Sequence, residues 1–174
     1  MPSLVIHSRI NDRELRRALR QLERAGGDMQ AMFADAGEYL IRSTEARFAA
    51  QVGPDGRPWQ EVKPQTRARK KHPKILTESH RLRDSIVYRA GPTQLAIGSN
   101  VAYAAIHQFG GRTRPHPIRP KRKKALFWSG AAHPVRVVQH PGSDIPARPY
   151  LGLSADDRAE LLAILGDHLA DALR

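Results

Sequence analysis

Residues 154–174 read SADDRAELLAILGDHLADALR, and they carry the clearest helical pattern in the chain. Leucines recur there at helical spacing, which places them along one side of a helix: Leu161, Leu162, Leu165, Leu169 and Leu173. Ser154 is suited to cap this helix, and Asp156 and Asp157 fall in its first turn, where the helix dipole favours acids. The sequence therefore predicts a C-terminal helix that buries its leucines against the rest of the protein.

Two further helices are predicted near the N-terminus, after a short first strand at Leu4–Arg9. Asn11 or Asp12 caps the first helix, which ends near Gly26 and has an apolar stripe of Leu15, Leu19 and Leu22. Asp28 begins a longer helix, whose stripe is made of Met32, Phe33, Ala36, Leu40, Thr44 and Phe48. Both stripes predict helices with one face in a core.

The middle of the chain predicts short antiparallel strands. Ser85–Arg89 and Gln94–Gly98 flank a turn and form a hairpin. Ala125–Trp128 and Val135–Gln139 are a second predicted pair. Val101–Phe109 is short and apolar, which fits either a helical turn or a continuation of the sheet.

A turn is predicted at residues 54–56, because proline presets φ and the glycine that follows accepts a positive φ. Trp59 comes directly after this turn and is expected to fold back over the end of the second helix. Residues 65–72 fit a short helix or a loop. Residues 76–84 fit a turn or a helix, with Thr77 as its cap.

Together these elements predict an α+β fold. It consists of an N-terminal helix pair, a mostly antiparallel β-sheet and a C-terminal helix packed on the sheet. Residues 145–150 contain two prolines and are expected to be extended. A chain of 174 residues, 40% of them hydrophobic, is expected to form one domain over 1–174.

The basic residues are concentrated in two stretches of a chain whose formal net charge is +12. Residues 67–74 form one stretch, and an extended arm at about 111–124 forms the other. The arm contains no acidic residue, and its cations are Arg112, Arg114, Arg119, Lys121, Arg122, Lys123 and Lys124. The segment Leu153–Arg174 instead has an acidic bias. This polarity suits binding to a polyanion or head-to-tail contact between copies, and the alternative is a solvated surface loop.

The composition excludes several kinds of site. The absence of cysteine rules out disulfides, thiolate zinc sites and cysteine nucleophiles. No apolar run approaches the roughly 20 residues of a membrane-spanning helix. The histidines form no metal-binding pair, and no nucleophile elbow or phosphate loop occurs. We therefore expect no catalytic residue, no metal, no cofactor, no secretion signal and no membrane contact.

Four short motifs follow one another along the chain. They are F-x-x-x-x-x-P-D-G-x-x-W (48–59), I-L-T-x-x-x-x-L-x-x-S-I (75–86), Y-A-x-x-H-Q-F-G (103–110) and I-P-A-R-P-Y-L-G (145–152). In this order, between helices, they resemble the phage virion morphogenesis family, also called tail completion proteins, of Mu-like and P2-like phages. The likeness covers nearly the whole chain.

The resemblance implies a non-enzymatic structural protein of the virion, at the head–tail junction or the top of the tail, with the host cytoplasm as its place of assembly. It implies a homo-oligomeric, hexameric ring that contacts head connector and tail proteins. The arm cations would then face the lumen and its DNA, or a neighbour. The expected subunit-contact residues are Trp59, Tyr103, His107, Phe109, Pro146, Arg148 and Pro149.

A second hypothesis is a sequence-independent nucleic-acid-binding accessory protein, because the arm supplies cations but the chain has no base-reading signature. A hydrolase built from scattered histidines is a third and weaker hypothesis.

Overall fold

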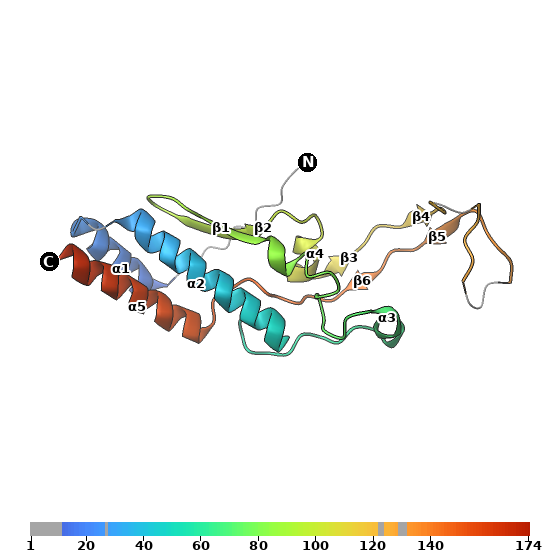
Figure 1. Ribbon diagram of the computed structural model, residues 1–174, viewed down its shortest axis with the longest axis horizontal. Helices are drawn as coiled ribbons and strands as arrows, with labels where there is room; N and C mark the ends of the chain where they lie inside the picture. Colours follow the sequence, from blue (N-terminus) through green and yellow to red (C-terminus); the bar gives the residue numbers. More distant parts are fainter. Residues whose placement is uncertain (1–11, 27, 122–123, 129–131) are drawn as a thin grey trace.

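The computed structural model describes residues 12–26, 28–121, 124–128 and 132–174, so the strand predicted at Leu4–Arg9 lies outside the described residues. The molecule is elongated (Figure 1). One end holds three helices, α1 (Arg13–Arg24), α2 (Met29–Ala50) and α5 (Ala155–Ala172), with the hairpin of β1 (Ile86–Ala90) and β2 (Leu95–Ser99) beside them. A thin arm extends from the other end.

Short elements connect the helical end to the arm. They are α3 (Pro64–Arg69), the 3₁₀ turn η1 (Arg83–Ser85), α4 (Ala104–Phe109), β3 (Gly111–Arg112), β4 (His116–Ile118), β5 (Val138–His140) and β6 (Asp144–Ile145). The described strands form three antiparallel pairs, β1 with β2, β3 with β6 and β4 with β5. The predicted α+β class is confirmed.

The three long helices begin at the predicted caps. The carboxylates of Asp12 and Asp28 each accept hydrogen bonds from two backbone amides of the first turn. Ser154 and Asp157 form a capping box, in which the Ser154 hydroxyl accepts from the Asp157 amide at 3.0 Å and the Asp157 carboxylate accepts from the Ser154 amide at 2.7 Å. Local sequence is sufficient to place these helix starts.

The helices and the hairpin share one apolar core. Leu161 and Leu165 of α5 lie in the same buried cluster as Leu22 of α1 and Leu40 of α2, and Ile97 of β2 packs against it. The C-terminal helix therefore packs on the sheet as predicted, in a core that α1 and α2 complete. At Gly37, α2 and β1 approach so closely that any side chain would collide with the ring of Tyr88.

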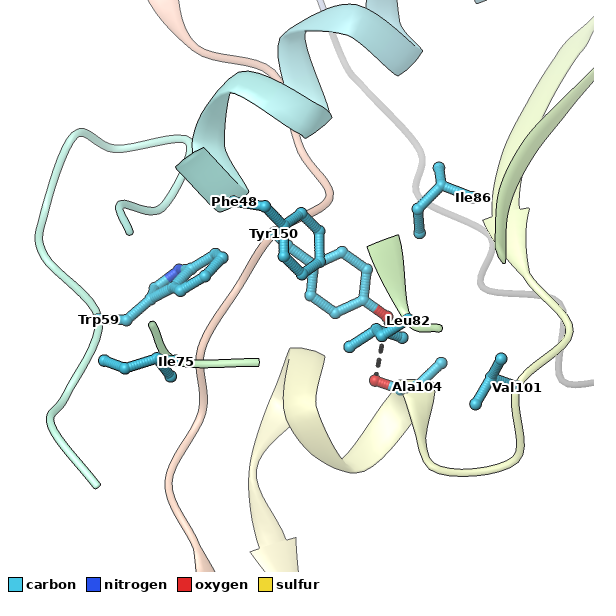
Figure 2. Close-up of a cluster of buried hydrophobic side chains, with 8 residues drawn as sticks. All are labelled: Phe48, Trp59, Ile75, Leu82, Ile86, Val101, Ala104 and Tyr150. Atoms are coloured by element: carbon cyan, nitrogen blue, oxygen red, sulfur yellow. Dashed lines mark hydrogen bonds between the residues drawn. The ribbon is translucent and has the colours of Figure 1, made fainter. Parts of the chain in front are cut away.

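A second apolar cluster lies where α2 ends (Figure 2). The ring of Phe48 meets Trp59 edge-on, with centroids 5.3 Å apart, and lies 5.4 Å from the ring of Tyr150. Trp59 thus folds back over the end of α2, as predicted. Gly56 supplies the positive φ, +75°, that the preceding turn requires.

The structure decides the segments whose sequence allowed two conformations. Residues 64–69 form helix α3, and residues 104–109 form helix α4. Between 76 and 82 the chain makes turns without a helix. Thr77 is not a helix cap, because its hydroxyl donates to the carbonyl of Lys74 at 3.0 Å.

The arm is a two-stranded ribbon. Its outgoing strand pairs in register with the returning chain, so that His116 lies opposite His140 and Ile118 opposite Val138. Farther out, the predicted pairing of 125–128 with 135–139 is confirmed by a bridge between Leu126 and Val135. The returning chain therefore supplies backbone partners that hold the arm extended.

A buried ion pair joins α2 to α5. Arg47 is bonded to Asp157, and their side chains are 7% and 1% exposed. The same carboxylate accepts from the Tyr39 hydroxyl at 3.2 Å and from the Ser43 hydroxyl. Arg47 also donates to the carbonyl of Tyr150 at 3.0 Å. Both charges are thus supported by further hydrogen bonds, as burial requires.

Replacing Arg47 with Met is expected to lower the free energy of unfolding by about 3–5 kcal/mol, because it leaves the Asp157 carboxylate buried without a counter-charge. Denaturant unfolding measures the loss. Arg42→Met, on the exposed side of the same helix, is the control and is expected to change stability by less than about 0.5 kcal/mol. Equal effects of the two changes would contradict this role of the pair.

Acid should weaken the fold through Asp157. Burial, the largest influence, opposes its ionisation, but hydrogen bonds from Ser154 and Ser43 and the charge of Arg47 hold the pKa of Asp157 below its usual 3.8. The carboxylate therefore stabilises the fold above the unfolded pKa, and this stability is lost as pH falls through the folded pKa. Unfolding of Asp157→Asn should depend less on pH below about pH 4 than unfolding of the wild type, with the exposed Asp167→Asn as control.

Candidate functional site

The segment 145–152 is the point at which several separate elements of the chain meet. The Trp59 indole donates to the carbonyl of Pro149 at 2.8 Å. The Tyr150 hydroxyl donates to the carbonyl of Ala104 in α4 at 3.1 Å (Figure 2). Arg47 of α2 donates to the carbonyl of Gly152 at 2.9 Å. Three separate parts of the sequence are thereby fixed to one extended segment, which we call the junction segment.

Gln108 attaches the junction segment to α4. Its side-chain oxygen accepts from the amides of Tyr150 and Leu151, each at 3.0 Å, and its side-chain nitrogen donates to the carbonyl of Leu151 at 2.8 Å. The carbonyl of His107 accepts from the amide of Arg148 at 2.7 Å. A side-chain amide can both donate and accept, so the buried Gln108 bonds the backbone of Tyr150 and Leu151 as a neighbouring strand would.

Arg148 and His107 are held at the side of the junction segment that faces residues 60–63. The Arg148 guanidinium donates to the carbonyls of Gln60 and Glu61, at 2.8 and 3.3 Å. Burial lowers the pKa of Arg148, and Glu61 partly opposes this. Burial, followed by the charge of Arg148, also lowers the pKa of His107, whose Nδ1 has no hydrogen-bond partner in the described residues. Both influences favour the neutral form of His107.

The residues expected to contact another subunit divide into two groups. Trp59 and Arg148 are buried and bond within their own chain. Tyr103 and Phe109 project to solvent, 39% and 64% exposed, and so remain available to a partner. Pro149 is also exposed, whereas His107 and Pro146 are half-buried. Their contact with another subunit stays a prediction.

The cations of the arm lie on its surface. Arg112 contacts Asp144 across the base of the ribbon at 3.8 Å. Arg114, Arg119, Lys121 and Lys124 are exposed. Arg122 and Lys123 lie outside the described residues.

The arm carries further exposed residues that were not expected from the sequence. Arg136 adds a cation on the returning chain. Four apolar side chains are exposed beside the cations: Ile118, Phe127, Trp128 and Val137. The sequence predicts strands at 125–128 and 135–139, and the structure shows that the ribbon leaves these side chains exposed.

The described residues offer little for chemistry. They contain no group of three or more histidines and acids that could hold a metal ion. None of the described helices is sufficiently long and apolar to cross a membrane. His116 and His140 stack across the ribbon, with ring centroids 5.1 Å apart, and within the described residues their ring nitrogens bond to backbone groups of Arg114 and Gly142. The arrangement instead offers a fixed junction and a projecting arm.

Comparison with known proteins identifies the family. A model of the phage virion morphogenesis family matches residues 10–170. The chain belongs to the phage virion morphogenesis family. It is therefore a phage assembly protein, and this family is not a known class of enzymes.

Relatives agree with this assignment. The chain is 32% identical to the "Putative capsid assembly protein G" of Escherichia phage Mu over 141 residues, which are 78% of this chain and 76% of the relative. It is 28% identical to the "Mu-like prophage FluMu G protein 2" of Haemophilus influenzae over 159 residues, 91% of each chain. No solved structure matches the chain.

Gln108→Leu tests the attachment of the junction segment. The change removes three hydrogen bonds and leaves backbone groups of the buried Tyr150 and the half-buried Leu151 unpaired, at a cost of roughly 1–3 kcal/mol for a fully buried group. We expect the free energy of unfolding to fall by at least about 2 kcal/mol. Gln65→Leu, on the exposed surface of α3, is the control. Unchanged unfolding of Gln108→Leu would contradict the attachment.

Proposed function

We propose that this member of the phage virion morphogenesis family is a ring-forming neck subunit of a tailed phage, required for tail completion as a tail terminator or head–tail joining protein. The family match supports a place in virion assembly. The name of the Mu relative refers to capsid assembly. The proposal also includes a position at the junction of head and tail, a hexameric ring, and contacts with head connector and tail proteins.

The observation that carries the proposal is the arm on its fixed base. The junction segment holds the base through Gln108 and Trp59, so the arm projects in a defined direction. The arm then exposes apolar side chains that a solitary subunit leaves in water, which is typical of an interaction site. A surface that binds a different surface of the next copy generates a ring when the rotation closes.

Nucleic-acid binding without sequence preference is the second candidate function, and the exposed arm cations favour it. It predicts that affinity for DNA falls with salt, with a log–log slope of about −0.9 for each phosphate neutralised. Replacing Arg114, Arg119, Lys121 and Lys124 with Gln should then weaken DNA binding and reduce the slope. DNA binding that survives these changes removes this candidate.

Electron microscopy of particles made without the gene tests the neck role. We expect full heads separate from tails, or tails of abnormal length, because the joining step lacks its ring. Normal infectious particles would contradict the role.

Purified wild-type particles provide a second test. They should contain the chain in a few copies per particle, as a single ring requires. Its absence from the particles would also contradict the neck role.

A further inference from the structure

The arm exposes apolar surface that a nucleic acid alone does not explain. Four of the eight large hydrophobic side chains that are exposed in the described part of the chain lie on it: Ile118, Phe127, Trp128 and Val137. Aromatic rings can stack on bases, but the aliphatic side chains gain most from burial against a protein. The arm therefore fits a protein partner with both apolar and charged surface.

The charge of the arm indicates that this partner is acidic. Among the described residues from 111 to 145, Asp144 is the acid, and it contacts Arg112. The exposed cations on the same ribbon are Arg114, Arg119, Lys121, Lys124 and Arg136. Complementary charge directs association and suppresses wrong partners.

An acidic surface exists at the other end of the same chain, although its net charge is +12. Helices α2 and α5 lie side by side and antiparallel, joined by Arg47 with Asp157 and by a contact of 2.8 Å between Asp35 and His168. Their exposed acids are Asp35, Glu38, Glu45, Asp156, Glu160, Asp167 and Asp171. We call these two helices the acidic face.

Few cations offset the acidic face. Arg42 lies near Glu38 and Arg174 pairs with Asp171 at 3.2 Å, while Arg158 turns away to Asp12 and Glu14. Leu173, 72% exposed at the end of α5, adds apolar surface beside the acids. The acidic face thus offers both kinds of surface that the arm requires.

The arm and the acidic face of one chain lie at opposite ends of the molecule (Figure 1). They therefore cannot meet within a subunit. Two unlike surfaces that complement each other but are separated on one chain form a heterologous, head-to-tail contact between copies.

We propose that the arm of each subunit binds along the acidic face of a second copy of this chain. The inference names the contact that would build the ring and so rests on the proposed function for its role in the virion. The arm cations pair with the acids of α2 and α5, and the aromatic side chains beside them become buried against the neighbour.

Charge reversal in the full-length chain tests the contact. The arm variant is Arg114→Glu with Arg119→Glu and Lys121→Glu. The face variant is Glu45→Lys with Glu160→Lys and Asp167→Lys. A matched control reverses Arg16, Arg17 and Arg20 on α1, which are also exposed. The oligomer mass of the purified proteins, measured in low salt, is the first readout.

The pattern of rescue decides the proposal. The arm variant alone and the face variant alone should lose self-association, because three charges that attract the neighbour in each wild-type contact then repel it. Their mixture should associate again, and so should one chain carrying both sets of changes. The α1 control should match the wild type, and high salt should weaken the wild-type oligomer.

Several results would overturn the proposal. One is a wild-type chain that stays monomeric at its highest soluble concentration, and another is an arm variant that associates normally. Failure of the combined variant to associate, while circular dichroism shows it folded, is a third. An arm variant that loses only DNA binding would assign the arm to DNA.

If the combined variant does not fold, the mixture of the two separately folded variants gives the decision. Particle yield in cells lacking the gene separates the two proposals. Normal particles without the gene contradict the neck role, whatever the purified chain does. Rescue by charge exchange in vitro supports the arm contact independently.

Discussion

The buried ion pair between Arg47 and Asp157 is the interaction on which the rest of the structure depends. Neither charge is stable in an apolar interior alone, so each requires the other at this position. The pair fixes the spacing of α2 and α5. Because Asp157 also caps α5 and Arg47 also binds the carbonyls of Tyr150 and Gly152, it fixes where the junction segment enters the last helix.

The junction segment connects the ion pair to the base of the arm. Gln108 binds it on the side of α4, and Trp59 binds it on the side of the turn after α2. The arm leaves this region through β3 and returns to it through β6. The base of the arm is thus positioned by the same contacts that close the core, while its outer part is free to present charge and apolar surface to a partner.

The local parts of the fold could be predicted from sequence. Helix starts at Asp12, Asp28 and Ser154, and the hairpin at residues 85–99, follow from capping and turn residues close together in the chain. The role of Gln108 could not be predicted, because its partners lie 42 and 43 residues away. The burial of Arg47 could have been inferred from its position, since it falls beside Thr44 and Phe48 on the buried side of α2.

The motifs that indicated the family turn out to be largely the residues of the junction. Trp59 and Gln108 both bond to the junction segment, which contains Tyr150, within one subunit. A motif can therefore reveal the family without revealing the contact surface. The exposed arm could be located from its charge, and the pairing of its outer part from the strand pattern. Its inner pairing joins residues twenty or more positions apart (Ile118 with Val138) and could not be predicted.

Electron cryomicroscopy of the head–tail junction in intact particles is the most direct test of this arrangement. We expect a closed ring of this chain in which each arm lies along α2 and α5 of the next subunit, with Arg47 and Asp157 paired inside each subunit. A junction without this chain, or a ring whose arms point into the lumen and touch only DNA, would contradict it.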